Sequence, residues 1–87
     1  MTHILIRNKV ANYDQWKSSY DAHAGVRKIV GLREEHVWRS VTDANDVFIL
    51  FATENLNTAL AYVNSAELRA TMQGAGVVDR PDIHILR

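Results

Sequence analysis

The sequence predicts one small α+β domain in which strands and helices follow the order βαββαβ. Three observations predict this order: strand-like alternation near both ends of the chain, two strand-like segments joined by a turn in the middle, and two helix-like stretches between them. No linker or low-complexity stretch divides the 87 residues, and the only proline is Pro81. We therefore treat residues 1–87 as a single domain. Such a chain buries only roughly 64% of its unfolded surface, which favours help from a partner subunit.

Composition and charge exclude several classes of binding partner and of chemistry. Ten Lys and Arg residues balance ten Asp and Glu residues, so the formal net charge is zero. This offers no electrostatic attraction to nucleic acid or to an anionic membrane, and we expect neither as a partner. The absence of cysteine excludes disulfides, thiolate catalysis and cysteine-held metal centres. The apolar N-terminal stretch is too short for a signal peptide or a membrane span, so a cytoplasmic location is expected.

The first strand and the first helix are predicted from residues 2–31. Residues 2–10 alternate, which puts Ile4 and Ile6 on one face of a strand and His3, Leu5 and Arg7 on the other. Asn12 is a suitable N-cap for the helix that follows, and Gly31 is a suitable stop. One stripe of this helix carries Tyr13, Trp16, Tyr20, His23, Ala24 and Arg27. The sequence predicts one helix here, with this stripe facing the sheet.

The middle of the chain predicts a hairpin. Residues 34–42 alternate, which puts His36, Trp38 and Ser40 on one face and Val37, Arg39 and Val41 on the other. The turn TDAND is rich in Asp and Asn and leads into VFILFA at residues 47–52, which is apolar on both faces.

The C-terminal third predicts a broken helix and a last strand. A second helix starts near Asn55, but its apolar stripe loses phase and Ser65 is a suitable new N-cap, so a kink is expected there. After a turn at the GAG of residues 74–76, Pro81 opens a strand of alternating apolar residues.

Right-handed crossovers convert this order into a ferredoxin-like, four-stranded antiparallel sheet with both helical segments on one face. Since residues 47–52 are apolar on both faces, the opposite face also needs a cover. A second copy of the chain would bury it, and we expect a homodimer. The alternative is that loops and long side chains shield this face.

The stretches HILIRNKVANYDQWKSSYDAH, VWRSVTDANDVFILF and YVNSAELRATMQGAGVVDRPDI resemble the antibiotic-biosynthesis-monooxygenase-like branch of the dimeric α+β-barrel superfamily. The resemblance covers nearly the whole chain and implies a dimer with a pocket between helices and sheet. Relatives include cofactor-independent monooxygenases acting on aromatic polyketides, haem-degrading enzymes, cyclases and isomerases. Haem degradation fits poorly, because that branch needs a Trp and a His that the third strand and the second helix lack here.

His23 and Arg27 are the leading catalytic candidates, because they are polar groups on an apolar stripe. His23 would move a proton or hydrogen-bond the substrate, and Arg27 would hold an oxyanion such as a phenolate or enolate. The alternative is that His23 is a satisfied boundary residue, and that Arg27 interacts with the helix dipole and extends to water.

His36 is a third catalytic candidate, and the ligand-binding candidates are Tyr20, Trp38, Leu68 and Met72. His36 and Trp38 share one face of their strand, so they line either the cavity or the dimer face. Further polar candidates are His3, His84, Arg7 and Tyr62. The histidines lack the spacing of a metal site, and neither a metal nor a cofactor is expected.

The resulting hypothesis is a small-molecule enzyme resembling cofactor-independent monooxygenases that act on aromatic or polyketide-like substrates, or a cyclase or isomerase of the same fold. One rival is a non-catalytic dimer that binds a small apolar molecule in a pocket without organised polar groups. Another is a dimerisation module whose interior is filled solid.

Overall fold

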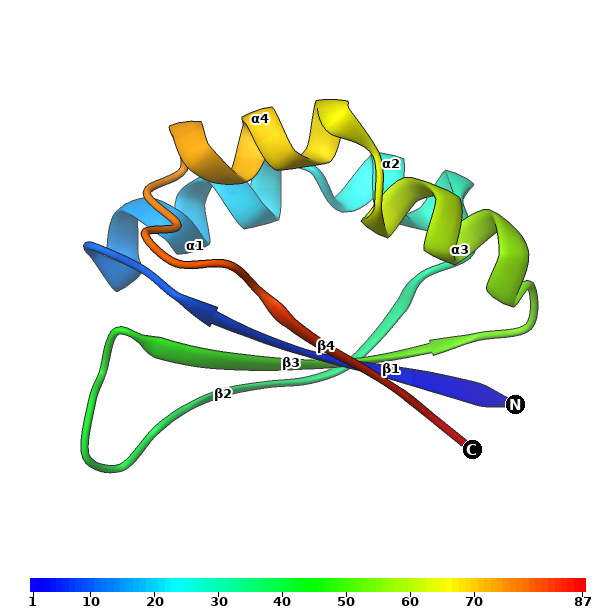
Figure 1. The fold of residues 1–87 in the computed structure, drawn as a ribbon, viewed down its shortest axis with the longest axis horizontal. Helices are drawn as coiled ribbons and strands as arrows, with labels where there is room; N and C mark the ends of the chain where they lie inside the picture. Colours follow the sequence, from blue (N-terminus) through cyan, green and yellow to red (C-terminus); the bar gives the residue numbers. More distant parts are fainter.

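The computed structural model describes all residues, 1–87, and contains a four-stranded antiparallel sheet with four helices on one face (Figure 1). The elements in chain order are β1 Thr2–Lys9, α1 Tyr13–Ala22, α2 Ala24–Ile29, β2 Arg33–Arg39, β3 Asp46–Thr53, α3 Leu56–Val63, α4 Ala66–Gly74 and β4 Asp82–Leu86. The strands lie in the order β2-β3-β1-β4. This confirms the predicted ferredoxin-like fold class.

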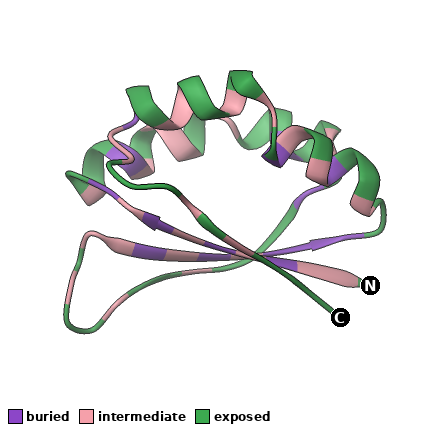
Figure 2. Cartoon of the chain, in the orientation of Figure 1, coloured by how far each residue is buried: buried purple, intermediate pink, exposed green.

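The core lies between the helices and the inner face of the two central strands. In the register of these strands, Ile4 is opposite Phe51 and Ile6 is opposite Ile49, as the alternation predicts. All four side chains are buried. Figure 2 shows that the buried residues gather on β1 and β3, with a few more in the helices. The inner face of the sheet is therefore the floor on which any internal cavity must rest.

The first helical segment is broken, and the prediction of one continuous helix from Asn12 to Gly31 is wrong. α1 ends at Ala22 and α2 starts at Ala24, with His23 between them. At the break the backbone N–H of His23 donates to the carbonyl of Tyr20 at 3.2 Å, which leaves the carbonyl of Ser19 free. The His23 ring takes this carbonyl instead, with Nδ1 at 2.8 Å. A side chain thus replaces a helical hydrogen bond that the break removes.

The predicted break in the second helical segment is confirmed. Asn55 caps α3 by accepting from the N–H of Thr58, and Ser65 caps α4 by accepting from the N–H of Leu68 at 3.2 Å. The hydroxyl of Ser65 also donates to the carbonyl of Tyr62 at 2.7 Å. α3 contributes buried Ala59 and Val63 to the core, whereas α4 contributes no buried residue. α4 is therefore the helix least fixed by core packing.

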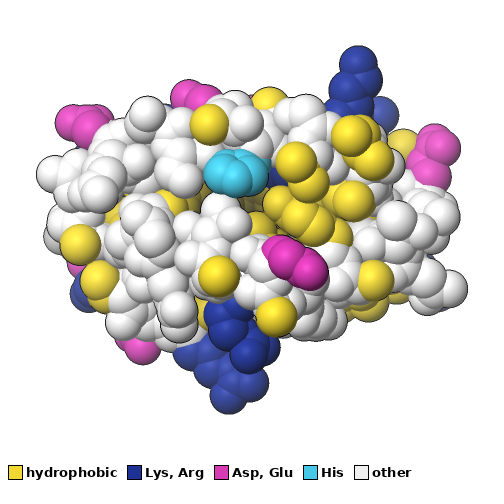
Figure 3. Space-filling model, turned by 90° about the horizontal axis from the view of Figure 1, so that it is seen from above, with side chains coloured by type: hydrophobic (Ala, Val, Ile, Leu, Met, Phe, Trp, Pro, Cys, Tyr) yellow, Lys and Arg dark blue, Asp and Glu magenta, His cyan; other side chains and the backbone are white.

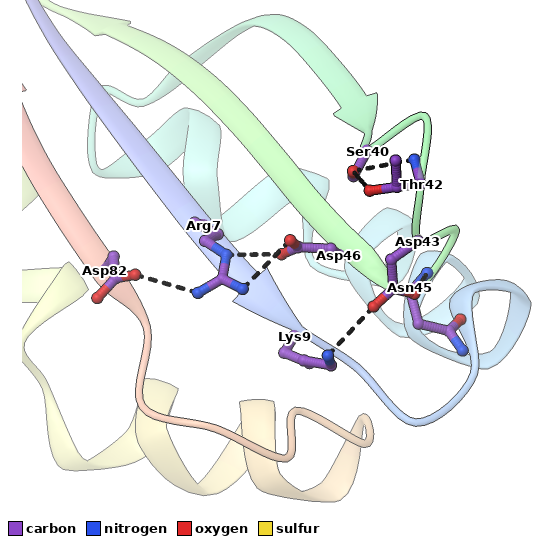
Figure 4. A network of polar contacts seen from close by, with 8 residues as sticks. All are labelled: Arg7, Lys9, Ser40, Thr42, Asp43, Asn45, Asp46 and Asp82. Carbon is purple, nitrogen blue, oxygen red and sulfur yellow. Dashed lines mark hydrogen bonds and ion pairs between the residues drawn. The ribbon is translucent and has the colours of Figure 1, made fainter.

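The outer face of the sheet has no cover in the single chain. Its apolar side chains are Leu5, Trp38, Phe48, Leu50 and Leu86, of which Trp38 is 47% and Leu86 44% exposed. Arg7 lies on the same face and forms ion pairs with Asp46 at 2.7 Å and Asp82 at 3.3 Å, which tie β1 to both neighbours (Figure 4). The apolar row that the sequence predicts on this face is thus present and uncovered.

Candidate active-site cavity

A cavity of about 70 Å³ lies between the helices and the inner face of the sheet. Of its 16 lining residues, 11 are hydrophobic. The strands contribute Ile6, Asn8, Ile49 and Phe51; α4 contributes Leu68, Thr71 and Met72. Seen from the helix side, hydrophobic side chains gather around a hollow with a histidine beside it (Figure 3). The interior is therefore hollow, which does not fit a module filled solid.

The structure brings five of the seven predicted site residues together around this cavity. They are Tyr20, His23, Arg27, Leu68 and Met72. His36 and Trp38 do not join them, because they pair with Leu50 and Phe48 on the outer face. There the two rings stack on each other, with centroids 4.6 Å apart and planes at 16°. His36 and Trp38 therefore belong to the uncovered sheet face and not to the cavity.

Arg27 is a buried cation without an acidic partner. Arg27 is only 9% exposed. Its side chain therefore does not extend to water, as the alternative interpretation of the sequence predicts. Its Nη1 donates to the carbonyl of Tyr20 at 2.6 Å, and the guanidinium lies 3.6 Å from the centre of the Tyr20 ring. None of the ion pairs in the structure involves Arg27. A buried charge in this condition favours an anionic ligand.

Tyr20 forms a rigid aromatic wall of the cavity. Its ring stacks on that of Trp16 with centroids 4.8 Å apart, and its hydroxyl donates to Glu34 at 2.8 Å. Burial, and after it the hydrogen bond to Glu34, raises the pKa of the Tyr20 phenol far above its ordinary value. Tyr20 therefore remains a neutral phenol, which suits a packing surface for a ligand and a support for Arg27.

His23 has one ring nitrogen, Nε2, without a partner in the protein. A backbone carbonyl can only accept a hydrogen bond, so the short contact to the carbonyl of Ser19 requires the hydrogen on Nδ1. In the neutral ring Nε2 then carries a lone pair, and no protein group donates to it. Since His23 lines the cavity, this nitrogen is available to accept a proton or hydrogen bond from a ligand.

The sequence analysis missed Asn8, although its position gave a signal. Asn8 lies two residues beyond Ile6, so the alternation of the first strand puts this polar residue on the apolar inner row. It lines the cavity, is 3% exposed, and its Oδ1 has no hydrogen-bond donor. Ser19 and Thr71 also line the cavity and were not predicted. Tyr62, a predicted polar candidate, does line it, and burial raises the pKa of its phenol.

The remaining polar candidates lie outside the cavity. His3 and His84 are on the outer face with Arg7, opposite Leu86 and Leu5 of the neighbouring strands. No three His, Asp or Glu side chains come together in a way that could hold a metal ion. None of the helices combines the length and apolar character needed to cross a membrane.

Comparisons with known proteins find similarity at the level of structure. No family model matches the chain, and no curated protein matches it significantly. A candidate antibiotic biosynthesis monooxygenase from Bordetella bronchiseptica is 11% identical with a TM-score of 0.78, over 99% of this chain and 94% of that one. A similarly named protein from Caulobacter crescentus is 16% identical with a TM-score of 0.72, over 98% and 86%.

A third solved structure contains a ligand. It is a monooxygenase from Streptomyces coelicolor in complex with nanaomycin D, 17% identical with a TM-score of 0.66, over 98% of this chain and 84% of that one. Identities this low establish the architecture and leave the chemistry open. The chain therefore has the fold of these antibiotic biosynthesis monooxygenase structures.

Proposed function

We propose that this protein is a small-molecule enzyme of the cofactor-independent monooxygenase type, acting on an aromatic or polyketide-like compound in the cavity between helices and sheet. The observation that carries the proposal is that His23 and Arg27 line the same mainly apolar cavity. His23 offers a free basic nitrogen, and Arg27 is a buried cation without a carboxylate. The ligand complex of the Streptomyces coelicolor protein, which shares the fold, supports the substrate class.

The chemistry follows from these two groups. Nε2 of His23 would take a proton from an acidic hydroxyl or C–H group of the substrate, and Arg27 would stabilise the phenolate or enolate that forms. Such an anion is electron-rich enough to reduce dioxygen itself. In the balanced overall reaction, a CH₂ group and one O₂ become a carbonyl group and one water, with the substrate supplying the electrons.

The size of the cavity requires a movement on binding. About 70 Å³ is well below the roughly 300–1,000 Å³ of most small-molecule sites. The roof formed by Leu68 and Met72 belongs to α4, which has no buried residue. We infer that α4 moves outward when the substrate enters, because the other walls are formed by the sheet and by stacked aromatic rings.

The rival hypothesis, a non-catalytic binding protein, predicts a pocket without organised polar groups. The side-chain contacts of Arg27 and His23 with the carbonyls of Tyr20 and Ser19 are an organised arrangement. This favours catalysis over simple storage. A non-catalytic binding protein would bind aromatic compounds without consuming oxygen, so oxygen uptake distinguishes the two hypotheses.

Self-association belongs to the same proposal. The outer face carries exposed Trp38 with Leu50 and Phe48 beside it, and an identical subunit packed face to face would cover this row. We infer a homodimer in which two sheets stack and each subunit keeps its own cavity.

The direct test measures oxygen uptake by the purified protein with a panel of anthrones and quinols, and identifies the products by mass spectrometry. We expect stoichiometric oxygen consumption and a new carbonyl group in at least one compound, with His84→Gln as active as the unmodified chain because His84 lies on the outer face. Binding without oxygen uptake across the panel would instead favour the storage protein.

A further inference from the structure

We propose that Glu34 is a positioning residue of the candidate site. Its carboxylate holds the phenol of Tyr20, and the Tyr20 ring in turn holds the guanidinium of Arg27 at the cavity. Glu34 does not line the cavity, so it acts on a ligand only through these two residues. The inference rests on the proposed function and deepens it, since it adds a residue of the edge strand β2 to the groups that set Arg27 against the substrate.

A β-bulge in β2 brings Glu34 to the helix side of the sheet. Glu34 is opposite Phe51 in the register with β3. The next pair joins His36 to Leu50, so Glu35 is an extra residue without a partner on β3. Regular alternation would put Glu34 on the outer face together with His36. The bulge instead turns Glu34 to the face of buried Phe51, and redirecting a side chain in this way is common next to active sites.

The contact that the bulge makes possible is a hydrogen bond to Tyr20. The hydroxyl of Tyr20 donates to Oε1 of Glu34 at 2.8 Å. A phenol bound to a carboxylate forms a stronger hydrogen bond than one bound to a neutral acceptor. Burial, and after it this bond, raises the pKa of the Tyr20 phenol. The ring is therefore held at its hydroxyl by β2 and along its face by Trp16, on which it stacks.

Tyr20 passes this constraint on to Arg27. The guanidinium of Arg27 lies 3.6 Å from the centre of the Tyr20 ring, and its Nη1 donates to the carbonyl of Tyr20 at 2.6 Å. The attraction between a cation and an aromatic ring requires the cation over the face of the ring, so a ring free to turn would hold Arg27 less firmly. Glu34 forms no ion pair with Arg27. It therefore fixes the position of the cation without pairing with its charge.

The first experiment follows Arg27 by NMR. An aromatic ring shields protons above its face, so the side-chain protons of Arg27 should resonate upfield of those of exposed Arg80. This upfield shift should decrease in Glu34→Ala and persist in Glu34→Gln, whose amide carbonyl still accepts from the phenol. Glu35→Ala is the matched control, because Glu35 pairs with Arg33 and should leave the shift unchanged. An Arg27 shift that is the same in Glu34→Ala as in the unmodified chain would overturn the inference.

The second experiment is a double-mutant cycle measured by oxygen uptake. Glu34→Ala and Tyr20→Phe should each lower kcat/KM about tenfold, since each removes the same hydrogen bond. The double variant should be no less active than either single variant, because the two groups act through one contact. Losses that multiply in the double variant would show that Glu34 acts independently of Tyr20, which would overturn the inference.

The two readouts separate this inference from the proposed function. Full activity in Glu34→Ala, together with a large loss in Arg27→Met, would overturn the positioning role of Glu34 and leave the proposed function intact. An Arg27 shift that depends on Glu34, in a chain that consumes no oxygen with any compound, would support the positioning of Arg27 and overturn the proposed function.

Discussion

The guanidinium of Arg27 lies 3.6 Å from the centre of the Tyr20 ring and donates to the carbonyl oxygen of the same residue. One residue at the end of α1 thus holds the cation by its ring and by its backbone. These two contacts hold Arg27 at the cavity, and no carboxylate pairs with its charge. Arg27 lies in α2 and Tyr20 in α1, so the two contacts join the helices on either side of the break at His23.

Replacement of Arg27 by methionine should lower kcat/KM by about 100- to 1,000-fold, because the variant loses the group that stabilises the substrate oxyanion. Steady-state oxygen uptake measures the effect. Arg39→Met is the matched control, since Arg39 lies 3.8 Å from the Tyr13 ring and donates to the carbonyl of Ala44 but is exposed and outside the cavity. Equal losses in the two variants would exclude a special role for Arg27.

The variant His23→Gln should reduce kcat by about 100- to 10,000-fold, since glutamine has no basic nitrogen to take the substrate proton. Single-turnover mixing with substrate under oxygen isolates the chemical step from product release. The same substitution at His84 leaves the cavity unchanged and serves as control. An unreduced single-turnover rate in His23→Gln would remove this residue from the mechanism.

Alkaline conditions should destabilise the protein through Tyr20. Its pKa is raised from an ordinary value of 10.0 by burial and by the hydrogen bond to Glu34. The unfolded chain therefore releases this proton first as the pH rises above about 10, and the free energy of unfolding falls from there upward. Below that pH the contribution is fully present.

Urea unfolding of the unmodified chain and of Tyr20→Phe at several pH values tests this expectation. Near neutral pH the variant should be less stable by about 1 kcal/mol, because it lacks the hydrogen bond to Glu34. The difference should shrink above about pH 10, because only the unmodified chain has a phenol proton at this position to release. Parallel curves over the whole range would show that Tyr20 titrates alike in both states.

Self-association through the outer sheet face should be abolished by Trp38→Glu, which replaces an exposed apolar side chain of the proposed interface with a charge. Sedimentation velocity should give a dimer for the unmodified chain and a monomer for this variant. Ile29→Glu is the control, because Ile29 is 84% exposed but lies on α2 on the opposite side of the sheet. A dimer that persists in Trp38→Glu would place the interface elsewhere.

The sequence was sufficient for the fold because each element has a strong local signal. The alternation around Ile4 and Ile6 identified the central strand and its buried face, and Ser65 marked the break between α3 and α4. The break at His23 was not predictable in this way. The helical stripe continues in phase through His23. The helix is nevertheless interrupted there, and the side chains of His23 and Arg27 contact the carbonyls of Ser19 and Tyr20 at the break.

The candidate site was predictable only in part for a related reason. Helical spacing correctly grouped His23 and Arg27 with Tyr20, because these residues share one stripe. Alternation in a strand separates two faces but does not say which one receives the helices. His36 and Trp38 could therefore not be assigned to cavity or outer face until the pairing of β2 with β3 was known.

The weak core packing of α4 affects how the sequence of this protein can change during evolution. Its side chains form the roof of the cavity, yet no residue of the helix is buried in the core. Substitutions at Leu68, Thr71 or Met72 therefore reshape the space above the ligand while the sheet and its aromatic supports keep the chain folded. The shape of the cavity roof is thus carried by a helix that adds no buried residue to the core, and the roof is free to drift.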